Sequence, residues 1–435
     1  MSGTGGPDHP VVAAPLQSRY IALPEEARLE EPVGGSPGAT YPTGFLAAGI
    51  VTGLKESGRP DMGVLAVAPE WRDGATSAGV FTTNAFAAAP VVINRTETDL
   101  GRVLGVVMSS GNANACTGEP GLVVARAMQK ACAATLGVPP ANVAVGSTGI
   151  IGVQLDPERM AAGAAKAAAA VRPDAGPEFD GAIMTTDRFP KMCALEVTLP
   201  EGTVRLGVCA KGAGMISPAM ATMLCVVTTD AVVSSADMQA LLAKGIDRSF
   251  NRVTVDGEMS TNDTVLFLSS GASGVTPGAA GLKVLGAALD AMLRRIALMM
   301  VADGEGATKI MRLTISGAED EVQAKKVARA VANSPLVKTC MHGGDPNWGR
   351  VISSAGAAMA GRSLPKARLY LCDVLVVEGG AAAGVSDSDW ARLQAAMQQP
   401  EIDIALELGL GAGSAEVFFA DMGHEYITIN AEYHS

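Results

Sequence analysis

From about residue 43 onward, short apolar runs alternate with glycine-containing turns, a pattern typical of β-strands joined by tight turns. The runs that predict strands are 63–68, 78–83, 89–93, 103–108, 367–377 and 415–420. Near the C-terminus, residues 426–430 alternate apolar and polar side chains, which predicts one more strand there.

Other stretches repeat apolar residues every three or four positions, which predicts amphipathic helices. These stretches are 121–136, 157–171, 236–249, 278–300 and 319–334. Asp156 stands where the second helix is expected to begin, and an aspartate side chain can accept a hydrogen bond from the first turn. Because strands and helices are interleaved along the chain, the fold class is expected to be α/β or α+β.

Residues 1–40 are rich in Pro, Gly and Glu and show little apolar periodicity. This composition predicts a flexible arm, with a short ordered piece around residues 20–23. No basic stretch precedes an apolar run at the start, so no signal peptide is expected.

Composition narrows the function classes. The 435 residues are 48% hydrophobic and only 18% charged, which allows a large buried core. The net charge of −11 argues against nucleic acid as a partner, and no apolar run approaches the roughly 20 residues of a membrane helix. Seven scattered cysteines without a CxxC pair and four dispersed histidines indicate no metal site and a reducing, cytoplasmic setting.

The segment 211–224 combines a lysine, two glycines, a proline and an isolated Thr222 just before an apolar run. A threonine becomes a good nucleophile when the peptide bond before it is cut, because the freed α-amine can act as its base. Self-cleavage between Ala221 and Thr222 is therefore one interpretation. The other is a core threonine whose hydroxyl binds a neighbouring carbonyl.

Two further places carry groups suited to catalysis. Thr148 and Gly149 are expected on a glycine turn, where a hydroxyl and a backbone N–H can bind an oxyanion; a simple turn is the alternative. Glu305 lies between two glycines, where its carboxylate can approach a ligand ammonium, or can be part of a solvated turn. Polar residues are also concentrated in 109–115, 184–191, 249–263 and 343–350.

In their order along the chain, these segments resemble the ornithine acetyltransferase (ArgJ) family from about residue 42 to the C-terminus. The segments that carry the resemblance are 42–45, 53–59, 78–84, 88–91, 110–115, 147–149, 185–187, 211–224, 249–252, 260–263, 303–309 and 345–350.

The resemblance implies an αββα-layered core over residues 41–315, as in the related aminopeptidase–esterase fold, and a smaller C-terminal domain over 316–435. It also implies self-processing into an α chain, 1–221, and a β chain, 222–435. Two copies of each chain are expected to assemble as α2β2.

The activity that the resemblance implies is transfer of an acetyl group from N2-acetylornithine to glutamate, by a ping-pong mechanism through an acetyl-threonine ester. Thr222 would be the nucleophile, and Thr148 with Gly149 would bind the oxyanion. No cofactor is implied, although some members of the family also take acetyl-CoA as the acetyl donor. The expected partners are small amino-acid substrates.

Family ligand positions correspond to six residues of this sequence: Thr185, Lys211, Thr222, Glu305, Asn430 and Ser435. Lys211 suits a substrate α-carboxylate, and Glu305 suits the side-chain ammonium of ornithine or could shuttle protons.

The chain departs from the family pattern at several places, among them Ala219, where the family has Asn or Asp, and Ser435, where it has threonine. These departures keep two other functions open. One is a family paralogue with a different acyl donor or acceptor in a specialised pathway. The other is an N-terminal-nucleophile amidase or aminopeptidase, in which water removes the acyl group.

Overall fold

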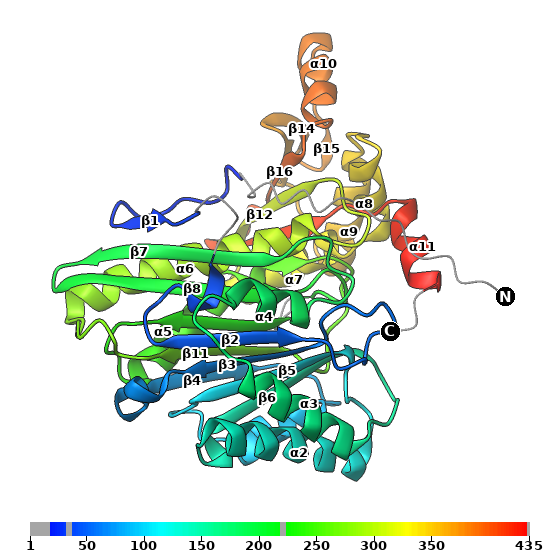
Figure 1. The fold of residues 1–435 in the computed structure, drawn as a ribbon. Coiled ribbons are helices and arrows are strands. Elements are labelled where there is room, and N and C mark those ends of the chain that lie inside the picture. Colours follow the sequence, from blue (N-terminus) through cyan, green and yellow to red (C-terminus); the bar gives the residue numbers. More distant parts are fainter. Residues whose placement is uncertain (1–17, 32–36, 218–222, 433–435) are drawn as a thin grey trace.

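The computed structural model describes residues 18–31, 37–217 and 223–432 (Figure 1). Within these ranges no helix combines the length and the apolarity that are needed to span a bilayer.

Two sheets lie face to face in the larger part of the molecule. The six-stranded sheet has the order β1-β7-β8-β9-β11-β4, and the four-stranded sheet has the order β2-β3-β5-β6. The strands of the first sheet are β1 (Ala27–Leu29), β7 (Lys191–Leu199), β8 (Gly202–Lys211), β9 (Leu224–Thr229), β11 (Thr264–Ser269) and β4 (Thr76–Phe81). Those of the second are β2 (Phe45–Ile50), β3 (Met62–Val67), β5 (Gly105–Asn112) and β6 (Val143–Ile150).

Helices cover the outer faces of both sheets (Figure 1). The six-stranded sheet is covered by α5 (Ser235–Arg248) and α6 (Ala279–Ala302), and the four-stranded sheet by α1 (Ala89–Thr96), α2 (Gly118–Leu136) and α3 (Pro157–Ala169). A further helix, α4 (Gly176–Ile183), packs on β2, β3 and β8. These layers confirm the αββα core.

Burial on both faces explains the composition of the central strands. All six residues of β9 are buried, as are all six of β3 and of β11. A strand covered on both faces reads as a continuous apolar run, because neither face meets water. One apolar cluster fills the space between the two sheets and includes Phe45, Met108 and Leu266.

The C-terminal part is built on a seven-stranded sheet with the order β10-β17-β12-β16-β13-β14-β15. Its strands are β10 (Val253–Thr254), β12 (Ile310–Ala318), β13 (Arg368–Leu371), β14 (Val374–Glu378), β15 (Ala381–Ala382), β16 (Glu401–Glu407) and β17 (Gly413–Ala420). Its helices are α7 (Glu321–Ala332), α8 (Pro335–His342), α9 (Trp348–Ala358), α10 (Asp387–Ala396) and α11 (His424–Glu432). Since β12 begins at Ile310, it crosses the position expected for the domain boundary.

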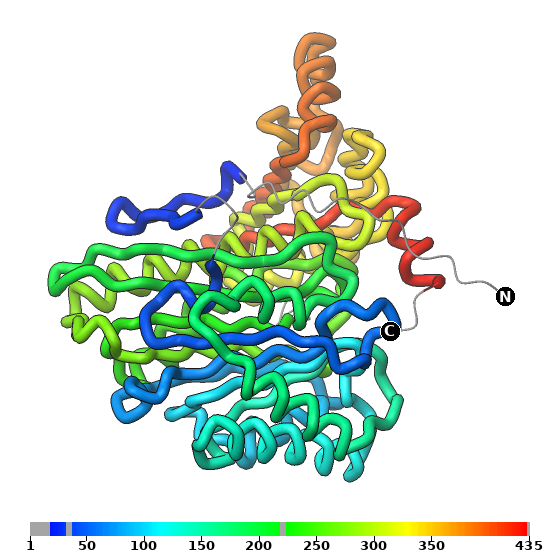
Figure 2. The backbone as a smooth tube through the Cα atoms, viewed as in Figure 1, coloured from blue at the N-terminus to red at the C-terminus, as the bar shows by residue number. Residues whose placement is uncertain are grey.

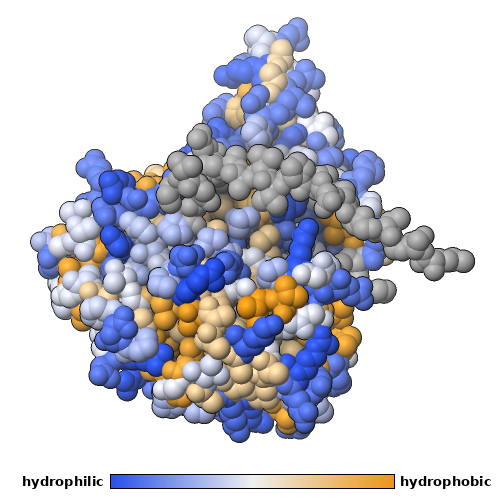
Figure 3. All heavy atoms as spheres, viewed as in Figure 1, coloured by the Kyte–Doolittle hydropathy of each residue, from blue (hydrophilic) through white to orange (hydrophobic). Residues whose placement is uncertain are grey.

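Helix α10 projects away from the layered body (Figure 2), and its surface is largely hydrophilic (Figure 3). Of its ten residues only Leu393 is buried. The four 3-10 turns of the described chain are Gly38–Thr40, Pro69–Gly74, Pro140–Asn142 and Phe250–Arg252.

Three local predictions were wrong. The apolar stretch 89–93 is the first part of helix α1, where Pro90 occupies the first turn and needs no hydrogen-bonding N–H. The alternating stretch 426–430 lies in helix α11, none of whose residues is buried, so its alternation reflects no sheet face. Thr148 and Gly149 are not on a turn but inside β6, paired with β5.

The predicted helix cap at Asp156 is confirmed, because the Asp156 side chain accepts a hydrogen bond from the Glu158 N–H.

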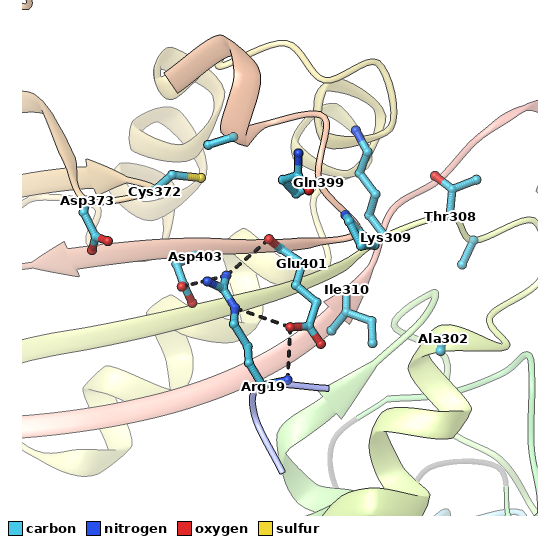
Figure 4. A pocket seen from close by; sticks show the side chains of 13 residues that line it. Arg19, Ala302, Thr308, Lys309, Ile310, Cys372, Asp373, Gln399, Glu401 and Asp403 are labelled. Atoms are coloured by element: carbon cyan, nitrogen blue, oxygen red, sulfur yellow. Dashed lines mark hydrogen bonds and ion pairs between the residues drawn. The ribbon is translucent and has the colours of Figure 1, made fainter. Parts of the chain in front are cut away.

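Residues 18–31 cross from the C-terminal sheet to the layered core. The ring of Tyr20 is buried against Phe418 of β17, with ring centroids 5.2 Å apart. Arg19 reaches Glu401 and Asp403 of β16, at the edge of a cavity of about 530 Å³ (Figure 4). Strand β1 then pairs antiparallel with β7.

Candidate active site

Six residues assigned from the sequence or the resemblance line one cavity of about 140 Å³: Thr148, Gly149, Thr185, Lys211, Glu305 and Asn430. They come from β6, from the end of β8, from the segment between α4 and β7, and from the segments that lead to and from the C-terminal sheet. Three other predicted site residues, Ala221, Thr222 and Ser435, lie outside the described residues.

Strand β6 presents Thr148 and Gly149 to this cavity, and close packing requires the glycine. The φ angle of Gly149 is +128°, and an added Cβ would lie 2.4 Å from the carbonyl carbon of Gly111 on β5. Only glycine fits such a backbone. The neighbouring β5 continues into the Asn-containing segment, where the Asn114 N–H donates to the Asn112 side chain.

Lys211 ends β8 and reaches across to β6. Its ammonium nitrogen donates a hydrogen bond to the Thr148 hydroxyl oxygen at 3.1 Å, and only 3% of the residue is exposed. Burial lowers the pKa of Lys211, although Asp187 partly offsets that effect. In the β8–β9 register Lys211 lies opposite Leu224, so the start of β9 is held beside the lysine.

The start of β9 is also held from β11. The backbone N–H of Met223 donates to the Asp263 carboxylate at 3.0 Å. Asp263 is fully buried, and burial raises its pKa well above the usual range, against the opposing influence of Lys211. Asn262 binds the carbonyls of Ala113 and Ser147, which joins β11 to the segment that carries Thr148.

Glu305 enters the cavity from the turn that follows α6. Its N–H donates to the Ala213 carbonyl at 3.2 Å, and its carboxylate accepts from the Asn430 amide at 2.7 Å. An added Cβ at Gly214 would lie 2.7 Å from this carboxylate, so the glycine leaves the room that Glu305 occupies. The resemblance places Glu305 and Asn430 among the six ligand positions, and the structure brings the two side chains into contact.

Further lining residues were not singled out individually from the sequence. Asp256 accepts hydrogen bonds from the N–H groups of Met215 and Ile216, and burial raises its pKa. Tyr426 lines the cavity from α11. The dense polar segment 249–263 was a usable signal for Asp256. Tyr426 was missed because residues 426–430 were predicted to form a strand and Tyr426 itself was not considered as part of the site.

The charges of the lining favour a ligand that carries both signs. Three carboxylates, Asp256, Glu258 and Glu305, line the cavity, and among the described lining residues Lys211 is the cation. A cationic side chain on the ligand would be attracted to the carboxylates, and a ligand carboxylate to Lys211. A hydroxyl and a strand N–H suited to an oxyanion lie in the same cavity.

Comparison with known proteins assigns the chain to a family. The model of the ArgJ family matches residues 46–435. The arginine biosynthesis bifunctional protein ArgJ of Nitratidesulfovibrio vulgaris is 44% identical over 91% of this chain and 99% of its own length. The protein of the same name from Symbiobacterium thermophilum is 41% identical, over 91% of this chain and 98% of its own length.

A solved structure of ornithine acetyltransferase from Mycobacterium tuberculosis, complexed with ornithine, is 37% identical to this chain. The match covers 46% of this chain and all of the solved chain, with a TM-score of 0.39. Because the family model and the two ArgJ relatives from Nitratidesulfovibrio vulgaris and Symbiobacterium thermophilum extend over nearly the whole length after the N-terminal arm, this chain belongs to the ArgJ family.

Proposed function

We propose that this chain is a glutamate N-acetyltransferase of arginine biosynthesis, which moves an acetyl group from N2-acetylornithine to glutamate. The observation that carries the proposal is the single cavity in which Lys211 and Glu305 face the oxyanion pair Thr148 and Gly149. The curated relatives, similar over nine-tenths of this chain, bear the name of an arginine biosynthesis protein.

The proposed site residues divide the recognition of acetylornithine between them. Lys211 attracts the α-carboxylate, and Glu305, oriented by Asn430, accepts the side-chain ammonium. Thr185 lines the same cavity and offers a hydroxyl and a backbone carbonyl. With both ends of the substrate held, the acetyl carbonyl is brought toward Thr148 and Gly149. Such orientation accounts for much of the rate enhancement of a two-substrate transfer.

The proposed chemistry uses Thr222 as the nucleophile after self-cleavage at the Ala221–Thr222 bond. Its hydroxyl attacks the acetyl carbonyl while its freed α-amine takes the hydroxyl proton. The Gly149 N–H and the Thr148 hydroxyl stabilise the resulting oxyanion. The ornithine α-amine leaves with a proton, and an acetyl ester remains on Thr222. The α-amine of glutamate then attacks this ester, which forms N-acetylglutamate and restores the threonine.

Because Thr148 accepts a hydrogen bond from Lys211, its own proton remains available to the oxyanion. This is the polarity that the proposed mechanism needs, since a hydroxyl that donated to a protein acceptor would have no proton left for the intermediate.

The proposal also includes an α2β2 assembly of the cleaved chains, a cytoplasmic location, and no cofactor, with acetyl-CoA as an alternative acetyl donor. The N-terminal nucleophile and the carboxylate-rich cavity are compatible with the amino-acid substrates, which are small and charged.

One experiment tests the proposal and its rivals together. The purified chain is first examined by denaturing gel and mass spectrometry, and cleavage at Ala221–Thr222 is expected. It is then incubated with N2-acetylornithine, with and without glutamate. N-acetylglutamate and a β chain heavier by one acetyl group are expected. Acetate release that does not depend on glutamate would instead indicate an amidase, and no reaction with either substrate would indicate a paralogue with another acyl donor.

A further inference from the structure

A buried lysine outside the assigned site lies beneath three of its segments. The Lys191 ammonium nitrogen donates to Asp187 at 2.7 Å and to Asp303 at 2.6 Å, and all three side chains are 0% exposed. Burying a charged group is costly because it loses its water, and an ion pair with hydrogen bonds offsets that cost. We call these three residues the Lys191 cluster.

The first carboxylate of the Lys191 cluster holds two segments of the cavity by their backbone. One oxygen of Asp187 accepts the Thr185 N–H at 2.9 Å, and the other accepts the Gly212 N–H at 2.7 Å. Gly212 directly follows Lys211 in the chain. Asp187 therefore fixes the backbone at Thr185 and next to Lys211.

The second carboxylate holds the third segment. Asp303 accepts hydrogen bonds from the backbone N–H and from Nε of Arg188, and it precedes Glu305 by two residues. The Glu305 N–H in turn donates to the Ala213 carbonyl. A displacement at Asp303 would therefore be transmitted to Glu305 and to the end of β8.

The pKa shifts of Lys191 and Asp187 favour a lasting ion pair between them, whereas burial raises the pKa of Asp303. Burial lowers the pKa of Lys191, but the neighbouring Asp187 and Asp303 outweigh it, so that the pKa is raised overall. Burial by itself would raise the pKa of Asp187. The neighbouring Lys191 and Lys211 outweigh burial and hold the pKa of this carboxyl below its usual range. Lys191 and Asp187 are thus ionised throughout the physiological pH range.

From this geometry we infer that Lys191 is a positioning residue for amino-acid recognition. It holds the segments of Thr185, Lys211 and Glu305 at the spacing that a substrate with one carboxylate and one ammonium requires. The inference rests on the proposed function. Lys191 touches none of the cavity itself, since it is not among the lining residues in the described part of the chain.

The variant Lys191→Met tests this role. We expect it to cleave itself at Ala221–Thr222, because cleavage needs no amino-acid substrate, while the KM for N2-acetylornithine rises at least about tenfold and kcat falls less than that. Misplacement of binding groups by about 1 Å costs up to about 100-fold in kcat/KM. The matched control is Lys338→Met. Lys338 is also fully buried and donates to the Ala420 carbonyl, but it does not line the cavity. The control is expected to change stability and leave both KM values within about twofold.

A second variant, Asp303→Asn, applies even where Lys191→Met does not fold, since it leaves the Lys191–Asp187 pair intact. It weakens the contacts of Asp303 with Arg188 and loosens the turn of Glu305, while the bonds of Asp187 to the Thr185 and Gly212 N–H groups remain. We expect the KM for N2-acetylornithine to rise about tenfold and the KM for glutamate, which has no side-chain ammonium, to stay within about twofold. A purely structural role would move the two KM values equally or not at all, and either result would overturn the inference.

Wild-type enzyme that transfers no acetyl group would contradict the proposed function and, with it, the inference. Acetyl transfer by the wild-type enzyme together with unchanged KM values in Asp303→Asn would contradict the inference alone.

Discussion

The ammonium nitrogen of Lys211 lies 3.1 Å from the hydroxyl oxygen of Thr148, and this hydrogen bond joins β8 of one sheet to β6 of the other. The resemblance gave the two residues separate tasks, substrate binding for Lys211 and oxyanion binding for Thr148. An ammonium has three protons, so Lys211 can donate to Thr148 and still bind a substrate carboxylate.

Lys211→Met should therefore impair both tasks. We expect kcat to fall about 100-fold to 1,000-fold, the loss typical of a disturbed oxyanion site, and the KM for both amino acids to rise. Steady-state kinetics of the processed enzyme measure both effects. Lys55→Met is the control, because Lys55 is a half-buried lysine that donates to the Pro60 carbonyl and does not line the cavity. A change in KM with unaltered kcat would show that Lys211 binds substrate but does not support the oxyanion site.

The pH dependence of kcat/KM should reflect the loss of the Lys211 proton at alkaline pH. Lys211 acts as a cation, and burial lowers its pKa, so activity should decline at alkaline pH earlier than for an ordinary lysine. In Lys211→Arg this decline should disappear, because a guanidinium stays protonated. Burial also lowers the pKa of Lys55, to about 8, and the variant Lys55→Arg shows whether that group contributes. If the decline persists in Lys211→Arg and vanishes in Lys55→Arg, the assignment is wrong.

Gly149→Ala should abolish acetyl transfer even though it adds one methyl group. The new Cβ would lie 2.4 Å from the Gly111 carbonyl carbon, which is backbone and cannot move aside without separating β5 from β6. Gly152→Ala is the matched control. Gly152 also has a positive φ, +83°, but nothing lies within 4 Å of its added Cβ. The control carries backbone strain of about 1 kcal/mol without the clash. Equal activity of the two variants would show that the close approach of β5 is unimportant.

Tyr20→Ala should destabilise the fold by about 3 kcal/mol, because it removes a buried aromatic ring. Tyr20 is 6% exposed, packs on Phe418 and donates its hydroxyl to Asp403. The neighbouring Arg19→Ala should cost less than about 1 kcal/mol, since the Arg19 side chain is 54% exposed and water at the arginine screens its ion pairs. Denaturant unfolding of both variants measures the difference. Similar losses in the two would show that the charges, rather than the ring, fasten residues 18–31.

Much of the secondary structure could be predicted from local pattern. The long helices with a regular apolar spacing, such as α2 and α6, lie where that spacing indicated. The apolar runs of β3, β4 and β17 are likewise strands. The prediction went wrong where a short run fits two periods. Residues 89–93 and 426–430 are each too short for apolar spacing to separate a strand from a helix.

Local sequence also identified which residue types could react but could not assign their partners. Glu305 between two glycines is a recognisable signal, yet its contacts with Asn430 and Gly214 join positions more than 90 residues apart. The polar segment 184–191 contains Asp187 and Lys191, but their pairing with Asp303 left no local signal, because Asp303 follows Lys191 by 112 residues. These ion pairs of Lys191 matter because they are buried, and burial arises only when the layers pack together.

By itself, the sequence determined the class of the fold, the positions of most helices and strands, and the family, and it named the candidate residues of the site. The helices and strands follow from the apolar period and from the placement of glycine and proline, which act within a few residues. The family follows from short motifs that occur in the same order along the chain. The tertiary structure alone decided that Thr148, Lys211 and Glu305 share one cavity, that Gly149 lies in a strand pressed against β5, and that Lys191 is buried between two carboxylates. The physical reason is that packing two sheets together fixes distances between segments that no local interaction connects.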